Sequence, residues 1–143
     1  SPYPEGPVDH SVPVLRIEGA DGQLRAVLFG YACHNTSLAL YQWNADYAGY
    51  AQDFVQAEHP GAVALFMMGC GGDQNPYPRR TLDWCQQHGR ALANGVETAL
   101  TVAPREVRGP LKAAYAEVDL DYAPLPSRDM DNTETIRQEK RVF

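Results

Sequence analysis

The sequence predicts an α/β fold: a mixed β-sheet in which an N-terminal β-hairpin is followed by a βαβαβ order, with the helices packed on the sheet. Two apolar runs, 24–33 and 62–68, have the length and composition of buried strands. The segments that follow them place apolar residues three and four positions apart, which is typical of amphipathic helices. With 44% apolar and 21% charged residues among 143, the chain has the composition of one globular domain.

The N-terminal part predicts an extended arm followed by a hairpin. Prolines punctuate residues 1–11, and the apolar residues of 12–18 indicate a first strand. The pair Asp21-Gly22 is a hairpin turn signal, so residues 12–18 should run antiparallel to 24–33. Because the run 24–33 does not alternate between apolar and polar residues, we expect it to be buried on both faces.

Two helices and two further strands are expected in the rest of the domain. The first helix covers residues 46–59 and returns the chain to the strand 62–68, whereas Thr81 caps the second helix and Pro104 ends it. Residues 112–122 alternate between apolar and polar side chains, which predicts a half-exposed strand. We therefore expect a domain over 12–122 and a charged tail over 123–143, helical from residue 127.

Composition excludes several classes of function. A net charge of −6 and a pI near 5.1, without a basic cluster before the last residues, argue against a nucleic-acid partner. No apolar stretch reaches the roughly 18 residues that cross a bilayer. Three cysteines cannot all pair within the chain, so a disulfide framework is not expected. A first residue other than Met and a loop-like opening suggest a fragment, whose partners are a small-molecule or lipid substrate and the rest of its own polypeptide.

His34 stands where the apolar run 24–33 ends, among hydroxyl and amide side chains. Imidazole at such a position is suited to binding a metal or to acting as a general base, and it can equally be a hydrogen-bonded structural group. The three other histidines, His10, His59 and His88, have weaker contexts and are expected to be structural or at the surface.

The second apolar run, 62–68, is followed by residues 69–76, a loop rich in glycine. Gly71 and Gly72 allow backbone N–H groups to converge on an anion or a developing oxyanion, or they serve only a tight turn. Asp73 and Asn75 could orient a water or a ligand carbonyl, or satisfy turn amides. The loop lacks the lysine and hydroxyl of a phosphate-binding loop, which disfavours nucleotide binding.

Two other groups of side chains allow alternative interpretations. Cys70 could act as a nucleophile with His34, although a small buried side chain is the more frequent role of such a cysteine. Aromatic residues gather between the two runs and could line an apolar ligand pocket or pack in the core: Tyr41, Trp43, Tyr47 and Tyr50.

Five short segments in order resemble the N-terminal domain of the neutral/alkaline ceramidase family, over roughly residues 10–120. They are Val14-Leu15-Arg16-Ile17, Ala20-Asp21-Gly22, Ala32-Cys33-His34-Asn35-Thr36-Ser37, Asp46-Tyr47-Ala48-Gly49-Tyr50-Ala51 and Gly72-Asp73-Gln74-Asn75-Pro76. The resemblance implies a zinc-dependent amidase that splits N-acyl sphingoid lipids, secreted or at a membrane surface. The other zinc ligands of the family lie outside the region that the chain covers.

By this resemblance His34 is one of two zinc-binding histidines, and Thr36 and Asp46 support the site without binding the metal. Gly71 and Gly72 belong to the loop that holds the scissile carbonyl. Asn75 stands where the family has a serine taken to be essential for catalysis, and an amide is not a nucleophile. The resemblance therefore leaves two interpretations: a hydrolase that uses metal-activated water, with Asp73 and Asn75 at the reaction centre, or a binding domain that has lost nucleophile and metal.

Overall fold

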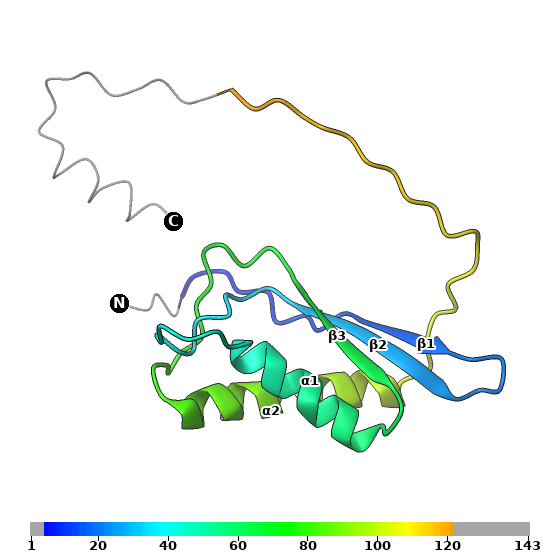
Figure 1. Ribbon diagram of the computed structural model, residues 1–143, viewed down its shortest axis with the longest axis horizontal. Coiled ribbons are helices and arrows are strands. Elements are labelled where there is room, and N and C mark those ends of the chain that lie inside the picture. Colours follow the sequence, from blue (N-terminus) through cyan, green and yellow to red (C-terminus); the bar gives the residue numbers. More distant parts are fainter. Residues whose placement is uncertain (1–4, 122–143) are drawn as a thin grey trace, which may run out of the picture. The chain divides into compact units, whose positions relative to one another are not determined.

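The structure is a computed structural model that describes residues 5–121. The chain divides into two compact units, Ser1–Pro104 and Arg105–Phe143. The helices and strands of the described residues all belong to the first unit (Figure 1). In chain order they are β1 (Val14–Glu18), β2 (Leu24–Tyr31), α1 (Asp46–Glu58), β3 (Val63–Met68) and α2 (Leu82–Thr101).

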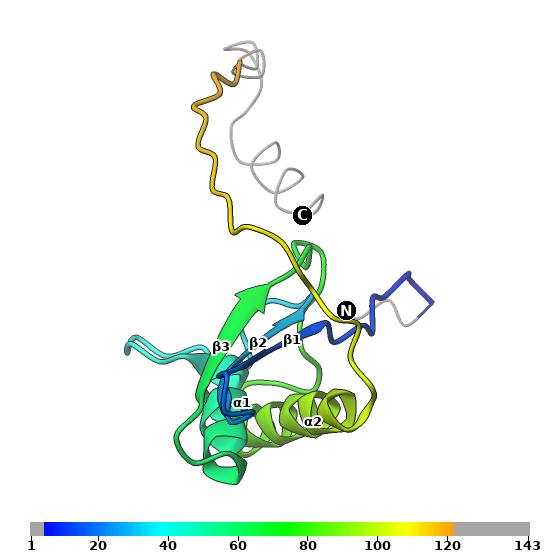
Figure 2. The same ribbon diagram turned by 90° about the vertical axis from the view of Figure 1, so that its right-hand side faces the viewer.

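The three strands form one mixed sheet in the order β1-β2-β3. β1 is antiparallel to β2, and β3 is parallel to β2 with α1 as the crossover between them. Both helices lie on the same side of the sheet (Figure 2), where they pack against each other, α1 beneath β3 and α2 beneath β1. The α/β fold and the hairpin followed by a βαβ unit are thus confirmed.

The hairpin turn is longer than the two residues that the sequence predicts. The N–H of Gly22 donates to the carbonyl of Gly19, and the Gly19 N–H donates to Gln23, so the turn extends over residues 19–23. Asp21 accepts a hydrogen bond from the Gln23 N–H and forms an ion pair with Arg25. A register shift at the end of β1 accommodates the extra residues.

The hydrophobic core lies between the sheet and the two helices. Phe29 and Phe66 are paired across β2 and β3 with their ring centroids 5.7 Å apart, and Tyr47 reaches the same cluster from α1. Most of the remaining buried apolar side chains are small, among them Val27, Val55, Ala51, Ala64, Cys85 and Val96, and Leu92 is the largest of the remainder. Small residues at this interface allow the helices to approach the sheet closely.

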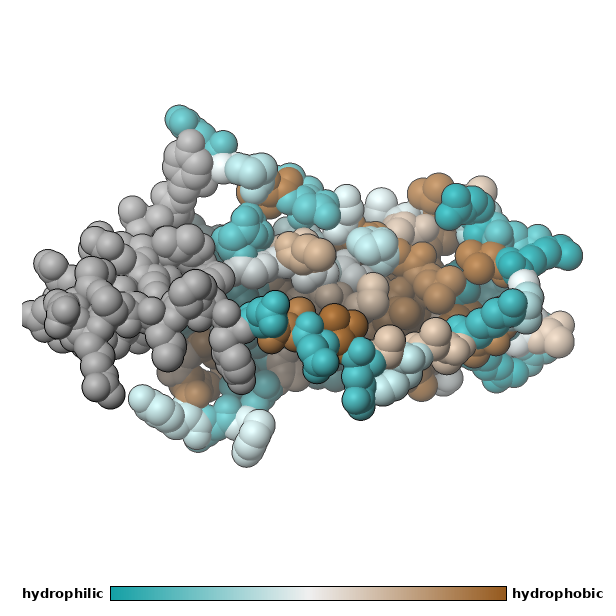
Figure 3. Space-filling view, turned by 90° about the horizontal axis from the view of Figure 1, so that it is seen from above, coloured by the Kyte–Doolittle hydropathy of each residue, from teal (hydrophilic) through white to brown (hydrophobic). Residues whose placement is uncertain are grey.

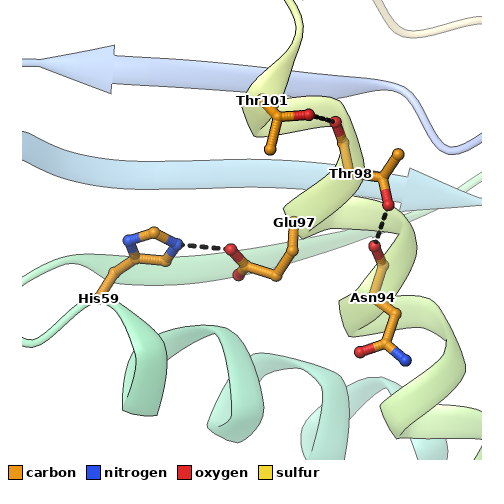
Figure 4. Close-up of polar contacts among 5 residues, drawn as sticks. All are labelled: His59, Asn94, Glu97, Thr98 and Thr101. Carbon is orange, nitrogen blue, oxygen red and sulfur yellow. Dashed lines mark hydrogen bonds and ion pairs between the residues drawn. The ribbon is translucent and has the colours of Figure 1, made fainter.

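Polar contacts fix the ends of the helices. Thr81 caps α2, as predicted, by accepting a hydrogen bond from the Trp84 N–H at 3.2 Å. At the far end of α1, His59 Nε2 lies 2.9 Å from a carboxylate oxygen of Glu97 on α2 (Figure 4). His59 therefore has the structural role expected for it.

The opposite face of the sheet corrects the prediction that residues 24–33 are buried on both faces. The strand register places eight small or apolar residues on that face: Leu15, Ile17, Ala26, Leu28, Gly30, Val63, Leu65 and Met67. Viewed from this side, Figure 3 shows apolar residues gathered over the strands. Within 24–33, Ala26 and Leu28 on this face are only partly buried, because both helices cover the other face. Leu15, Leu65 and Met67 on the neighbouring strands are about half exposed.

The prediction of a strand over 112–122 is wrong for residues 112–121, which the structure describes. Residues 105–121 contain neither helix nor strand, and their side chains are exposed. An alternating pattern states only that one face is apolar, whereas a strand forms only where its backbone pairs with a neighbour. The expected helix over 127–143 lies outside the described residues. No helix within residues 5–121 combines the length and apolar character that a membrane span requires.

Candidate functional site

The two strand ends that the sequence singles out meet at one edge of the sheet. Parallel pairing of β2 with β3 brings the segment after Tyr31 beside the loop after Met68. The Gly69 N–H donates to the Tyr31 carbonyl at 3.0 Å, and the His34 N–H donates to the Gln74 carbonyl, also at 3.0 Å. Main-chain hydrogen bonds therefore tie the 69–76 loop to the segment that carries His34.

Gly71 explains why this loop can lie so close to the end of β2. A Cβ at Gly71 would overlap backbone atoms of Ala32 and Cys33, whereas a Cβ at Gly72 would meet nothing within 4 Å. Gly71 is buried, and its N–H donates to the Gly69 carbonyl at 2.8 Å. Close backbone contact, with no positive φ at either residue, is thus the reason for glycine at position 71.

The His34 side chain is half-buried, and a backbone carbonyl holds its ring. His34 Nε2 lies 3.0 Å from the Gly72 carbonyl oxygen. A carbonyl can only accept a hydrogen bond, so Nε2 is the nitrogen that carries the proton. In the neutral ring this leaves the lone pair on Nδ1, and a hydrogen bond of this kind is how proteins orient a metal-binding imidazole.

Asn75 lies beside this histidine segment and is held by two side chains. Its Oδ1 accepts a hydrogen bond from the Thr36 hydroxyl at 3.0 Å and another from the Arg79 guanidinium at 3.3 Å. The amide oxygen is thereby occupied, and the Nδ2 group has two N–H bonds to donate. Asp73 is exposed, and its carboxylate makes no hydrogen bond within the part of the chain that the structure describes.

Asp46 is a buried carboxylate that binds backbone N–H groups. Its Oδ1 accepts from Ser37 at 2.9 Å and from Tyr47 at 2.8 Å, and its Oδ2 accepts from Leu38 at 2.9 Å. Asp46 itself has a φ of 51°, a left-handed conformation that Asp tolerates better than most residues. These bonds fix the segment after His34 on the first turn of α1.

The buried hydroxyl and thiol groups of this region are held in their protonated forms. The Tyr47 hydroxyl donates to the Cys33 carbonyl at 2.8 Å, and burial raises the pKa of Tyr47 far above its ordinary value. Burial likewise raises the pKa of the Cys33 thiol, and it raises the pKa of Cys85 to about 11. Cys70 is exposed, so the expectation of a small buried side chain is wrong there.

An open cavity of about 430 Å³ lies next to this cluster. Residues from the N-terminal arm, the end of β2, the 74–77 segment and α2 form its walls, and most of them are apolar. Asn75 and Tyr47 line it, and so does His88, whose Nε2 donates to the Pro78 carbonyl at 2.6 Å. The cavity therefore joins an apolar volume to the amide of Asn75.

The aromatic group of the sequence divides into two pairs. Tyr47 is buried and lines the cavity, and Tyr50 is half-buried against the core. Tyr41 and Trp43 are fully exposed and fit neither the pocket nor the core interpretation.

Sequence reasoning missed Arg79, which contacts Asn75. Its only sequence signal is the pair Arg79-Arg80 shortly after the loop, in a chain of net negative charge.

The described residues do not surround His34 with other metal-binding side chains. Nowhere within residues 5–121 do three His, Cys, Asp or Glu side chains come together in a way that could hold a metal ion. Catalytic zinc takes three protein ligands as a rule, so a complete site needs ligands from outside these residues.

Comparisons with known proteins find a likeness among solved structures. No family model matches the sequence, and no curated protein matches it. Among solved structures, the chain is similar to neutral ceramidase from Pseudomonas aeruginosa, with a TM-score of 0.54 and 22% sequence identity. The similar region covers 66% of this chain and 18% of that one. At this identity the likeness is one of fold: the chain shares the architecture of a part of that enzyme.

Proposed function

We propose that this chain is part of a ceramidase-like, zinc-dependent hydrolase that cleaves an amide bond of an N-acyl sphingoid or related lipid. The observation that carries the proposal is the contact between His34 and the 69–76 loop at the shared end of β2 and β3. Ligands of α/β sheets bind at the carboxyl ends of the strands, which is where these two segments meet. The fold likeness to part of neutral ceramidase supports the same reaction class.

In this proposal His34 is a zinc ligand through Nδ1. The Gly72 carbonyl holds the opposite nitrogen and so fixes the tautomer and the orientation of the ring. A bound zinc would supply a Lewis acid and lower the pKa of a bound water toward neutrality. The other ligands come from outside the described residues. Thr36 and Asp46 act by positioning the segment around His34.

Asn75 is a hydrogen-bond donor to the scissile carbonyl in this mechanism. Because Thr36 and Arg79 occupy its Oδ1, the amide is oriented with Nδ2 as its remaining polar group. The Gly72 N–H makes no hydrogen bond among the described residues and can serve as a second donor to the developing oxyanion. In this proposal Gly71 holds the turn, and the exposed carboxylate of Asp73 orients a water.

The cavity favours a lipid amide over a small polar one. Its volume of about 430 Å³ lies within the range of pockets that take drug-sized ligands, and its walls are mostly apolar. Asn75 lines this cavity, so an apolar chain in it would bring the adjoining carbonyl toward the amide.

The test is hydrolysis by the complete polypeptide that carries this chain. The assay measures release of sphingoid base from an N-acyl sphingoid lipid in detergent micelles. We expect turnover that His34→Ala lowers by at least about 100-fold, which is at the upper end of losses seen on removing a single group that supports a metal site. The matched control is His59→Ala, because His59 binds Glu97 at the far end of α1 and should leave turnover unchanged. Equal losses in both variants would contradict the proposal.

A second candidate is a binding domain without catalysis. The observation that favours it is the pair of hydrogen bonds from Thr36 and Arg79 to the Asn75 oxygen. These bonds would stabilise the loop equally well if Asn75 had no part in catalysis. This domain would take the same lipid into the cavity without cleaving it. Retained binding of a fluorescent N-acyl lipid without any release of base would favour this candidate over the hydrolase.

A further inference from the structure

The loop between β2 and α1 carries large apolar side chains that are highly exposed to solvent. In residues 39–45, called the aromatic loop below, the relative exposure of Tyr41 is 108% and that of Trp43 is 105%, while Leu40 is 56% exposed. In Figure 2 the cyan loop before α1 projects away from the sheet and the helices. Large apolar side chains in such a position are typical of contact with another surface.

The base of the aromatic loop is fixed beside the candidate site. On the N-terminal side, the carboxylate of Asp46 accepts hydrogen bonds from the N–H groups of Ser37 and Leu38. On the C-terminal side, the Asp46 N–H donates to Asn44 Oδ1 at 3.0 Å. One residue before Ser37, the Thr36 hydroxyl binds Asn75. The exposed aromatic residues therefore stand on a short, anchored base within a few residues of the cluster around His34.

The charge of the loop and of the whole chain indicates which kind of surface the loop can contact. Residues 35–45 contain no charged side chain, and the whole chain has a net charge of −6. This charge gives no attraction to anionic headgroups, so contact depends on the apolar and aromatic side chains. Trp and Tyr favour the boundary between lipid headgroups and acyl chains, where the ring is apolar and its N–H or O–H stays hydrated.

We propose that the aromatic loop inserts into the interface of an uncharged or zwitterionic lipid surface through Leu40, Tyr41 and Trp43. The inference rests on the proposed function, because a hydrolase of N-acyl lipids must extract its substrate from such a surface. Insertion at this loop would hold the cluster around His34 and Asn75 at the plane of the headgroups. An amide bond of a membrane lipid lies at that depth.

Tryptophan fluorescence tests the insertion directly. Residues 1–143 contain two tryptophans, Trp43 and Trp84. Replacing every tryptophan of the complete polypeptide except Trp43 by Phe leaves Trp43 as the sole emitter. We expect phosphatidylcholine vesicles to shift the Trp43 emission to the blue, and brominated acyl chains to quench it. Emission that vesicles leave unchanged would overturn the proposal. Emission that is blue-shifted before vesicles are added, together with a dimer in gel filtration, would overturn it in favour of contact with a second copy of the chain.

Substitution in the loop gives an independent readout. The double variant Tyr41→Ser with Trp43→Ser should lower vesicle binding at least tenfold in co-sedimentation. The matched control is Tyr115→Ser, another exposed tyrosine outside the loop, which should bind as the unaltered chain does. Equal binding of the double variant and the control would refute the role of the loop.

A soluble substrate separates this inference from the function on which it rests. The complete polypeptide with Trp43→Ser should cleave a short-chain, water-soluble N-acyl amide at the unaltered rate. If the unaltered polypeptide cleaves that amide and does not bind vesicles, the loop proposal fails and the hydrolase stands. If the unaltered polypeptide binds vesicles and cleaves no amide, the hydrolase fails and lipid contact by the loop stands.

Discussion

Replacing Gly71 by alanine should separate the loop from the end of β2. The added Cβ would overlap backbone atoms of Ala32 and Cys33, which cannot rotate away as a flexible side chain can. Either the loop or the strand end must move. Gly72 is the matched control, because a Cβ there would meet no atom within 4 Å and its φ is not in the left-handed region.

The magnitude follows from this difference in surroundings. Forcing an extra methyl into a packed contact costs about 1–3 kcal/mol of unfolding free energy. At Gly72 the same change fills open space and restricts the unfolded chain, which stabilises by about 0.4–1 kcal/mol. We therefore expect the unfolding free energies of Gly71→Ala and Gly72→Ala to differ by about 1.4–4 kcal/mol.

Urea unfolding followed by circular dichroism measures both variants against the unaltered chain. Hydrogen exchange of the His34 amide, which is bonded to the Gln74 carbonyl, adds a local readout. We expect this amide to exchange faster in Gly71→Ala than in Gly72→Ala. If the two variants unfold at the same urea concentration, the close approach of the loop to β2 is refuted, and with it the geometry of the candidate site.

Four further predictions concern the groups around this contact. Asp46→Ala should lower the unfolding free energy in urea by about 3–5 kcal/mol, because it leaves three N–H groups without their charged acceptor. Asp46→Asn should lower it less, because one oxygen remains. Equal losses in the two variants would contradict this role of Asp46. Thiol labelling of the native chain at pH 8 should modify Cys70 quickly and Cys33 and Cys85 only after unfolding. The raised pKa of Cys85 means that the folded chain keeps a proton that the unfolded chain loses, so unfolding free energy should fall as pH rises from about 9 to about 11, and less so in Cys85→Ala. Asn75→Ala should lower kcat of the complete polypeptide by about 100-fold with little change in KM, and an unchanged kcat would exclude Asn75 from the reaction.

Local chemistry made much of the fold predictable from the sequence. The Thr81 cap and the apolar spacing along α2 report on neighbours within one or two helical turns. The segment Asp21-Gly22 likewise specifies a reversal of the chain. Parallel pairing of 24–33 with 62–68 then follows from the single helix between them, and it brings His34 to the 69–76 loop.

Features that depend on distant partners could not be predicted in this way. The continuous apolar pattern of β2 does not indicate which element covers each face of the sheet. In the structure both helices pack on the same face. The alternation of apolar and polar residues over 112–122 does not indicate whether a neighbouring strand is present for this segment to pair with. Arg79 reaches Asn75 only because the chain turns after Pro76, and the exposure of Cys70 depends on how the loop lies. These outcomes are tertiary, and local propensity does not encode them.

Zinc content is the most direct test of the central claim that His34 belongs to a metal site. The complete polypeptide should be purified without added metal and assayed by elemental analysis, together with His34→Ala and His59→Ala. We predict about one zinc per chain in the unaltered protein and in His59→Ala, and a loss of zinc in His34→Ala. A folded protein without zinc, or zinc retained in His34→Ala, would contradict the account.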